Sequence, residues 1–146
     1  MVRELRPDEI DEVLREELVG RIGYYDVRRV NIVPIAYAYD GTFVYGYSVD
    51  GSKVMSMRKH PSVCFQVDSI HDAANWRSVL GWGRYEELHD DDAVNAVKLI
   101  SARLRTIASG AQVEAMRSYV SRRGEYGFAY RIRLIEKVGR TEGSER

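Results

Sequence analysis

Apolar side chains near the start of the sequence recur with the period of an α-helix. Within residues 7–18, one helical face would carry Ile10, Val13, Leu14 and Leu18. Pro7 suits the first turn of a helix, where its missing amide hydrogen is not needed. The pattern therefore predicts a helix that begins near residue 7 and ends before Gly20.

From residue 19 onwards the pattern changes to short runs of β-branched and aromatic residues, which are typical of strands. Strands are predicted over residues 19–25, 30–39, 42–47, 62–69, 76–88 and 126–138. The pair Asp40-Gly41 favours a tight hairpin turn between the second and third of these strands. Strands joined in this way, without regular alternation with helices, predict an antiparallel sheet that forms a small barrel.

Further helices are predicted over residues 52–59, 90–107 and 111–120, of which the last two precede the final strand. We therefore expect an α+β protein, mainly β, with a six-stranded antiparallel barrel, an N-terminal helix and helices before the last strand. Residues 1–138 are expected to form a single domain, and residues 139–146 a flexible tail.

The composition narrows the class of protein. The chain has 146 residues, of which 45% are hydrophobic, and 22 Lys and Arg balance 22 Asp and Glu. A net charge of zero argues against a protein that binds nucleic acid through bulk charge. No apolar run reaches the roughly 20 residues that a membrane-spanning helix needs. With Cys64 as the single cysteine, no internal disulfide can form, so we expect a cytoplasmic protein.

Motifs of known catalytic sites are absent from the sequence. The histidines His60, His71 and His89 are far apart and do not predict a metal site. Cys64 lies in a predicted strand, where a buried and inert thiol is typical. The sequence therefore identifies no catalytic residue.

One candidate site lies in residues 45–53, where a strand leads into a loop of small and hydroxyl residues and then into a helix. Backbone amides at the helix start, together with Ser48, Ser52 and Lys53, could hold a phosphate group. The alternative is an ordinary strand-to-helix connection in which Ser48 caps the helix and Lys53 is solvated.

A second candidate site lies in residues 76–84, which combine aromatic, guanidinium and hydroxyl side chains on one strand. Trp76 and Ser78 could border a planar ligand. The alternative is that Trp76 and Trp82 belong to the core or contact another subunit.

The predicted N-terminal helix and five segments that follow it in a fixed order span about residues 8–88. They are VGRIG at 19–23, VPIAYAYDG at 33–41, VYGYS at 44–48 with GSK at 51–53, HPSVCFQVD at 60–68, and WRSV at 76–79 followed by GR at 83–84. Together they resemble the FMN-binding split barrels of the pyridoxamine 5′-phosphate oxidase type, and most closely the nitroimidazole-resistance branch of that family.

The resemblance implies a homodimer that binds FMN in a groove between its two subunits. Val33, Pro34 and Ile35 would lie beside the isoalloxazine ring, and Tyr47 and Ser48 near the ribityl chain and phosphate. Ser52 and Lys53 would complete the phosphate site, while Trp76 and Ser78 would lie near the ring. A shift of one residue in the register would put Arg77 in the place of Ser78.

The activity implied by the resemblance is that of an oxidoreductase. Its FMN would pass electrons from a reduced nicotinamide to a small organic acceptor, such as a nitroaromatic compound. Two alternatives stay open: a flavin-binding module without catalysis, and a deazaflavin-dependent reductase on the same barrel. The chain departs from its relatives at Gly46, where many members of the resistance branch have histidine. It also has Ser52 where the true oxidases have arginine, so oxidation of pyridoxamine phosphate is not expected.

Overall fold

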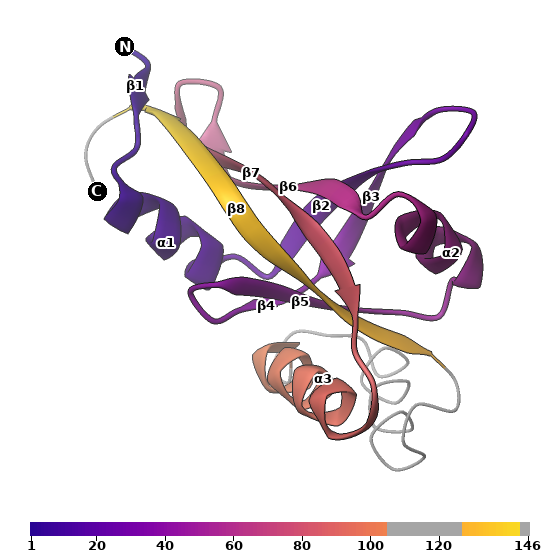
Figure 1. The fold of residues 1–146 in the computed structure, drawn as a ribbon. Helices are drawn as coiled ribbons and strands as arrows, with labels where there is room; N and C mark the ends of the chain where they lie inside the picture. Colours follow the sequence, from indigo (N-terminus) through magenta and orange to yellow (C-terminus); the bar gives the residue numbers. More distant parts are fainter. Residues whose placement is uncertain (105–126, 144–146) are drawn as a thin grey trace.

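The structure, a computed structural model, describes residues 1–104 and 127–143. These residues form eight strands, which pair into one curled antiparallel sheet (Figure 1). The strands are β1 (Arg3–Glu4), β2 (Val19–Tyr25), β3 (Val30–Ala36), β4 (Ala38–Tyr39), β5 (Phe43–Ser48), β6 (Ser62–Asp72), β7 (Asn75–Glu87) and β8 (Phe128–Glu142). Their order in the sheet is β3-β2-β6-β7-β8-β5-β4, and β1 pairs with the end of β8.

The predicted α+β split barrel is confirmed, although the described residues hold more strands than the six predicted. The six longer strands correspond to the predicted ones, the strand predicted over residues 30–39 is divided into β3 and β4, and β1 is a further strand of two residues. A strand as short as β1 carries no alternating pattern and was therefore not predicted.

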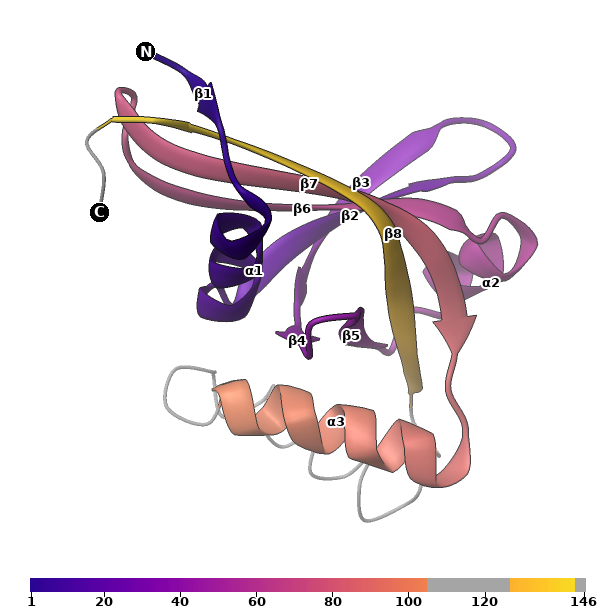
Figure 2. The same cartoon turned by 60° about the vertical axis from the view of Figure 1, so that its left-hand side comes forward.

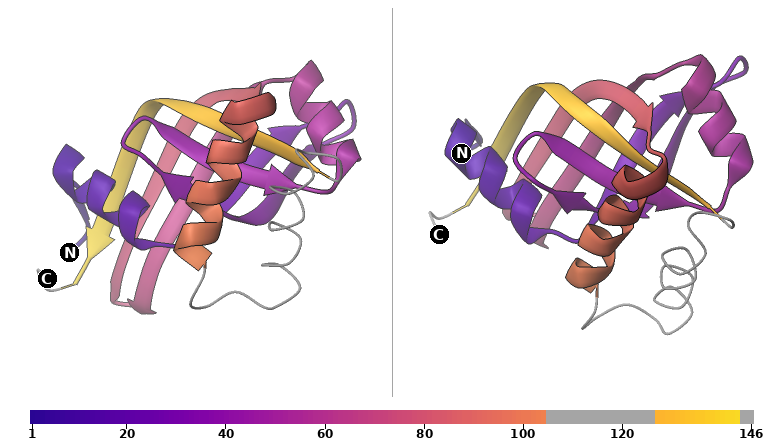
Figure 3. Two further views of the ribbon diagram at one scale, coloured as in Figure 1. Left: turned by 90° about the horizontal axis from the view of Figure 1, so that it is seen from below. Right: turned by 60° about the horizontal axis from the view of Figure 1, so that its bottom comes forward.

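The described residues contain three helices: α1 (Pro7–Glu16), α2 (Gly51–Lys59) and α3 (Asp90–Leu104). Figure 2 shows α3 running below β4 and β5, with α1 beside the long strands of the sheet. α1 and α2 lie at opposite ends of the barrel (Figure 3). The helix predicted over residues 111–120 lies outside the described part of the chain. None of the described helices is long and apolar enough to span a lipid bilayer.

Two apolar clusters cover the two faces of β5. The larger one joins α1 and α2 to the inner face of the sheet, and it includes Val13, Leu14, Ile22, Tyr37, Val44, Val54, Met57, Phe65, Val67, Tyr130 and Ile132. The smaller one packs the apolar side of α3 against Ala38 and Ala129, with Tyr45 and Tyr47 at its border. Because neighbouring residues of a strand face opposite sides, Val44 faces the first cluster, and Tyr45 and Tyr47 face the second.

The outer face of the sheet carries large apolar side chains that remain exposed. Register pairs such as Tyr25 with Val30, Cys64 with Trp82, and Leu80 with Val138 place them on one surface. Ile32 is 70% exposed and Trp82 is 41% exposed. We call this surface the outer apolar face, and its exposed members are Val19, Tyr25, Val30, Ile32, Ile70, Trp82, Ile135 and Val138.

The C-terminal strand is longer than the sequence indicated. Residues 139–142 were expected to begin a flexible tail, but they pair with β7, from Gly139 opposite Val79 to Glu142 opposite Trp76. The expected start of the tail is therefore wrong. Gly139 lies directly beneath Leu5 and Ile10, and a Cβ at position 139 would crowd both side chains. The polar residues at the C-terminal end of β8 face β1 and solvent, so their polarity resembles that of a flexible tail.

Candidate functional site

The end of β5 and the start of α2 lie at one end of the barrel (Figure 1). Ser48 is the last residue of β5, and Ser52 and Lys53 lie in the first turn of α2. β5 ends at Ser48, and α2 begins three residues later at Gly51. Val54 and Met57 are fully buried and fix α2 against the core. The predicted strand-to-helix connection is therefore present, with the hydroxyls and the lysine at its centre.

Asp50 is the N-cap residue of α2. Its Oδ1 accepts hydrogen bonds from the backbone amide of Ser52 (3.0 Å), the Ser52 hydroxyl (2.9 Å) and the backbone amide of Lys53 (3.4 Å). These bonds, that of the Ser52 hydroxyl foremost, hold the pKa of the Asp50 carboxyl below its usual value. The amides that we expected to bind a phosphate are thus already occupied by an ionised carboxylate.

Ser48 does not cap the helix. Its Oγ accepts a hydrogen bond of 3.0 Å from the backbone amide of Asp50, and its side chain is buried. Ser48 therefore holds the turn that presents Asp50. The sequence missed the role of Asp50, although an aspartate just before the first helical turn is a common capping residue.

Lys53 has a largely buried side chain near the Asp50 carboxylate, but the two form no ion pair. Lys53 is 8% exposed, and within residues 1–104 and 127–143 its ammonium has no hydrogen bond and no ion pair. Burial lowers the pKa of the Lys53 ammonium, and the nearby Asp50 carboxylate opposes that effect. Because a buried unpaired charge is unfavourable, Lys53 is suited to receive an anion.

Tyr47 lies next to Ser48 in sequence but on the other face of β5. It borders the cluster under α3, whereas Ser48 faces the larger core. The side chains of Tyr47 and Ser48 therefore face opposite sides of the end of β5. This outcome follows from the two-residue period of a strand.

Val33, Pro34 and Ile35 lie on β3, at the edge of the sheet. Pro34 faces outward and is exposed, while Val33 and Ile35 turn towards the larger core. β3 pairs with β2 on one side, and no other described strand pairs with its second side. Its backbone amides and carbonyls on that side can therefore form hydrogen bonds with a ligand. This is the edge beside which the resemblance implies a flavin ring.

Trp76 and Ser78 lie on the outer face of β7, away from Lys53. β2 and β6 separate β7 from β3, a distance of roughly 14 Å at the usual strand spacing. Ser78 Oγ accepts a hydrogen bond of 3.1 Å from Gln66 Nε2, and Trp76 Nε1 donates to Glu142 Oε2 at 3.2 Å. One copy of the chain therefore does not gather all nine predicted residues around one ligand.

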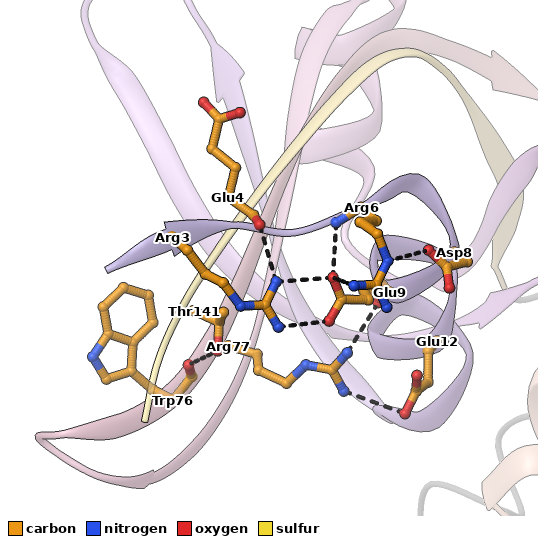
Figure 4. Close-up of polar contacts among 9 residues, drawn as sticks. All are labelled: Arg3, Glu4, Arg6, Asp8, Glu9, Glu12, Trp76, Arg77 and Thr141. Atoms are coloured by element: carbon orange, nitrogen blue, oxygen red, sulfur yellow. Dashed lines mark hydrogen bonds and ion pairs between the residues drawn. The ribbon is translucent and has the colours of Figure 1, made fainter. Parts of the chain in front are cut away.

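Arg77 faces the opposite side of β7 and takes part in an ion-pair network with the N-terminal segment (Figure 4). Its Nη1 lies 3.3 Å from Glu12 Oε1, and its Nη2 donates to the Glu9 carbonyl at 3.5 Å. In the observed register, the Ser78 side chain therefore lies on the outer face of the sheet and the Arg77 side chain does not. An open hollow of about 710 Å³ adjoins this network, and Trp76 is the one predicted residue that lines it.

Gly46 is enclosed by Tyr130, its register partner on β8. A Cβ at position 46 would overlap the Tyr130 ring, so a histidine does not fit here unless Tyr130 moves. Tyr130 is fully buried, and its hydroxyl has no hydrogen-bond partner in the described part of the chain. The glycine that distinguishes this chain from many members of the resistance branch is therefore required by its packing.

Comparison with known proteins identifies relatives over most of the chain. Residues 6–122 match the sequence family described as pyridoxamine 5′-phosphate oxidase. The crystal structure of a FAD-binding protein from Mesorhizobium loti is 30% identical, with a TM-score of 0.76 over 98% of this chain and 99% of that one. A candidate 5-nitroimidazole antibiotic resistance protein from Bacteroides thetaiotaomicron gives a TM-score of 0.75 over 97% of this chain and 87% of that one. At 15% identity, this second likeness shows the fold alone.

A curated relative is known from Rhizobium meliloti, the uncharacterized protein RA0666. It is 37% identical over 82 residues, which are 51% of this chain. The match spans about half (54%) of the length of that relative.

Proposed function

This chain belongs to the pyridoxamine 5′-phosphate oxidase family, and we propose that it binds a flavin nucleotide in a groove between two copies of the chain. The observation that carries the proposal is the Lys53 side chain, which is largely buried at the start of α2 and whose ammonium makes no hydrogen bond or ion pair with the described side chains. A phosphate would supply the missing negative charge. The FAD-binding relative from Mesorhizobium loti supports a flavin as the ligand.

The residues around this point fit the parts of a flavin nucleotide. Lys53 would hold the phosphate, and the free edge of β3 would offer backbone groups to the isoalloxazine ring. Pro34 lacks an amide hydrogen, so the amides of its neighbours would serve the ring. FMN and FAD share this ring and the first phosphate, and both are compatible with these contacts.

A second copy of the chain would complete the groove. The outer apolar face leaves large side chains such as Ile32 and Trp82 in water, which is unusual for a monomer unless the surface has a partner. Trp76 and Ser78 share this face and are far from Lys53 of their own chain. In the proposed dimer they approach the flavin that is held by Lys53 of the other copy.

We further propose that the bound flavin supports an oxidoreductase. When bound, the flavin supplies the redox chemistry, and the protein orients the ring and excludes water from it. The electron donor would be a reduced nicotinamide, and the acceptor a small organic molecule. A protein that binds flavin but does not oxidise NADH or NADPH with any acceptor would instead be a non-catalytic flavin-binding module.

The first experiment is an absorption spectrum of the freshly purified protein, with the chromophore identified after denaturation. We expect a flavin spectrum, or uptake of added flavin, and in Lys53→Ala we expect flavin binding to weaken by about 1–3 kcal/mol, since a charge-assisted contact is lost. Titration followed by flavin fluorescence measures this change.

Lys59→Ala is the matched control, because Lys59 is exposed in the last turn of the same helix. It should bind flavin as the unmodified protein does. If Lys53→Ala binds flavin with unchanged affinity, the phosphate assignment is wrong. A released deazaflavin in place of FMN or FAD would shift the proposal to the deazaflavin-dependent reductase.

A further inference from the structure

Asp50 places a negative charge at the point where the phosphate of the proposed flavin would bind. We infer that Asp50 determines which flavin nucleotide is accepted: it disfavours the terminal phosphate of FMN and favours a phosphate that is bonded on both sides, by an ester and an anhydride, as in FAD. This inference rests on the proposed flavin site at Lys53. It concerns the charge state of the phosphate, which the family resemblance does not specify.

The first step concerns the backbone amides at the start of α2. A phosphate at the N-terminus of a helix usually receives backbone amide hydrogen bonds. Here the amides of Ser52 and Lys53 and the Ser52 hydroxyl all donate to Asp50 Oδ1. An incoming phosphate therefore meets Lys53 as its main donor and the Asp50 carboxylate as a close neighbour.

The second step is the balance of charge. Asp50 is ionised, since its hydrogen bonds stabilise the carboxylate, and its charge counters only part of the positive charge of Lys53, with which it forms no ion pair. The terminal phosphate of FMN is a monoester that carries about −1.5 to −2 charges at neutral pH. Each phosphate of FAD is bonded on both sides and carries one negative charge. Repulsion by Asp50 is thus about twice as large for FMN as for the nearest phosphate of FAD.

The test is to remove the charge of Asp50 and to keep its cap. Asp50→Asn does this, because asparagine caps a helix as well as aspartate does. Affinities for purified FMN, purified FAD and riboflavin are measured at low ionic strength, where repulsion between exposed charges is least screened. Riboflavin carries no phosphate and reports any change in the ring site.

The matched control is Asp40→Asn. The Asp40 carboxylate also accepts two backbone amides, those of Thr42 (2.9 Å) and Phe43 (2.8 Å), and one hydroxyl, that of Tyr45 (2.7 Å). Asp40 precedes β5, whereas Asp50 follows it, so the two carboxylates lie beyond opposite ends of the strand. The same chemical change is therefore made at a distance from Lys53.

In Asp50→Asn we expect FMN affinity to rise about tenfold and FAD affinity about threefold, since the second effect is half the first in free energy. Riboflavin affinity should stay the same, and Asp40→Asn should change none of the three. An unchanged ratio of FMN to FAD affinity, or an equal change for riboflavin, would overturn the role of Asp50. If no flavin binds to the unmodified protein, the proposed function fails and this inference fails with it.

Discussion

Two fully buried tyrosines in this protein differ in whether their hydroxyl is satisfied. Tyr37 Oη donates a hydrogen bond of 2.7 Å to the Leu14 carbonyl, whereas Tyr130 Oη has no partner in the described part of the chain. A buried hydroxyl without a partner costs free energy, since it has lost its bonds to water. We therefore expect Tyr130→Phe to leave the free energy of unfolding unchanged or to raise it by about 1 kcal/mol.

Tyr37→Phe provides the contrast in the same experiment, a urea denaturation monitored by circular dichroism. It should lower the free energy of unfolding by about 1–2 kcal/mol, because the Leu14 carbonyl loses its donor. A loss of stability in Tyr130→Phe as large as that in Tyr37→Phe would mean that the Tyr130 hydroxyl is hydrogen-bonded in solution.

At the scale of single residues, the sequence predicted where Ser52 and Lys53 lie in the fold, but not which groups surround them. It pointed to Ser52 and Lys53, because the residue types that supply a hydroxyl and a cation at a predicted helix start can be identified directly from the sequence. It did not show that Asp50 takes the amides at that start, because several nearby residues could have served as the cap. It also placed Tyr47 and Ser48 in one site, although the two-residue period of a strand separates them.

At the scale of elements, an ion-pair network fastens β1 and α1 to β7 (Figure 4). Arg3 donates two hydrogen bonds to the Glu9 carboxylate, at 3.0 and 2.9 Å, and the Arg6 amide donates a third at 2.9 Å. These contacts, that of Arg3 foremost, lower the pKa of Glu9 from its usual value of 4.5 to about 2. The stabilisation is therefore complete above pH 4.5 and is lost as the pH falls towards 2.

We expect Glu9→Gln to remove part of the acid sensitivity of folding. Urea unfolding between pH 5 and pH 2.5 should show a smaller loss of stability in this variant than in the unmodified protein. Glu4→Gln is the control, since Arg3 contacts the backbone carbonyl of Glu4 and not its carboxylate. An identical pH dependence in Glu9→Gln and the unmodified protein would contradict the assignment.

The elements themselves were largely predictable, since the six longer strands and the three described helices each carry a periodic pattern. The boundaries that differ have physical reasons. β6 extends to Asp72 and β7 begins at Asn75, although the sequence predicted a polar loop there. Side chains at the tip of a hairpin are solvated whether the backbone is paired or forms a loop, so their polarity does not distinguish the two. The end of β8 is polar for the same reason.

At the scale of the whole molecule, the outer apolar face predicts self-association. A positive charge within it should prevent it, because a charge without a partner is costly to bury in an interface. We expect Ile32→Arg to shift the protein from dimer to monomer in analytical ultracentrifugation, and to weaken flavin binding with it. The control is Leu99→Arg, which adds the same charge elsewhere on the molecule. Leu99 is exposed on α3, a helix that packs against β4, β5 and β8. Tight flavin binding by a monomeric Ile32→Arg would argue against a site shared between two copies.

The position of β8 in the sheet has a consequence for how the chain acquires its fold during synthesis. β8 lies between β7 and β5 and is the last strand in the sequence. Until residues 128–142 have left the ribosome, one half of the sheet ends at an open edge of β7, and the other is the short pair of β4 and β5. Open edges of this kind pair readily with other chains. A nascent chain that stalls before Phe128 therefore leaves two unjoined half-sheets, each a target for chaperones and proteases.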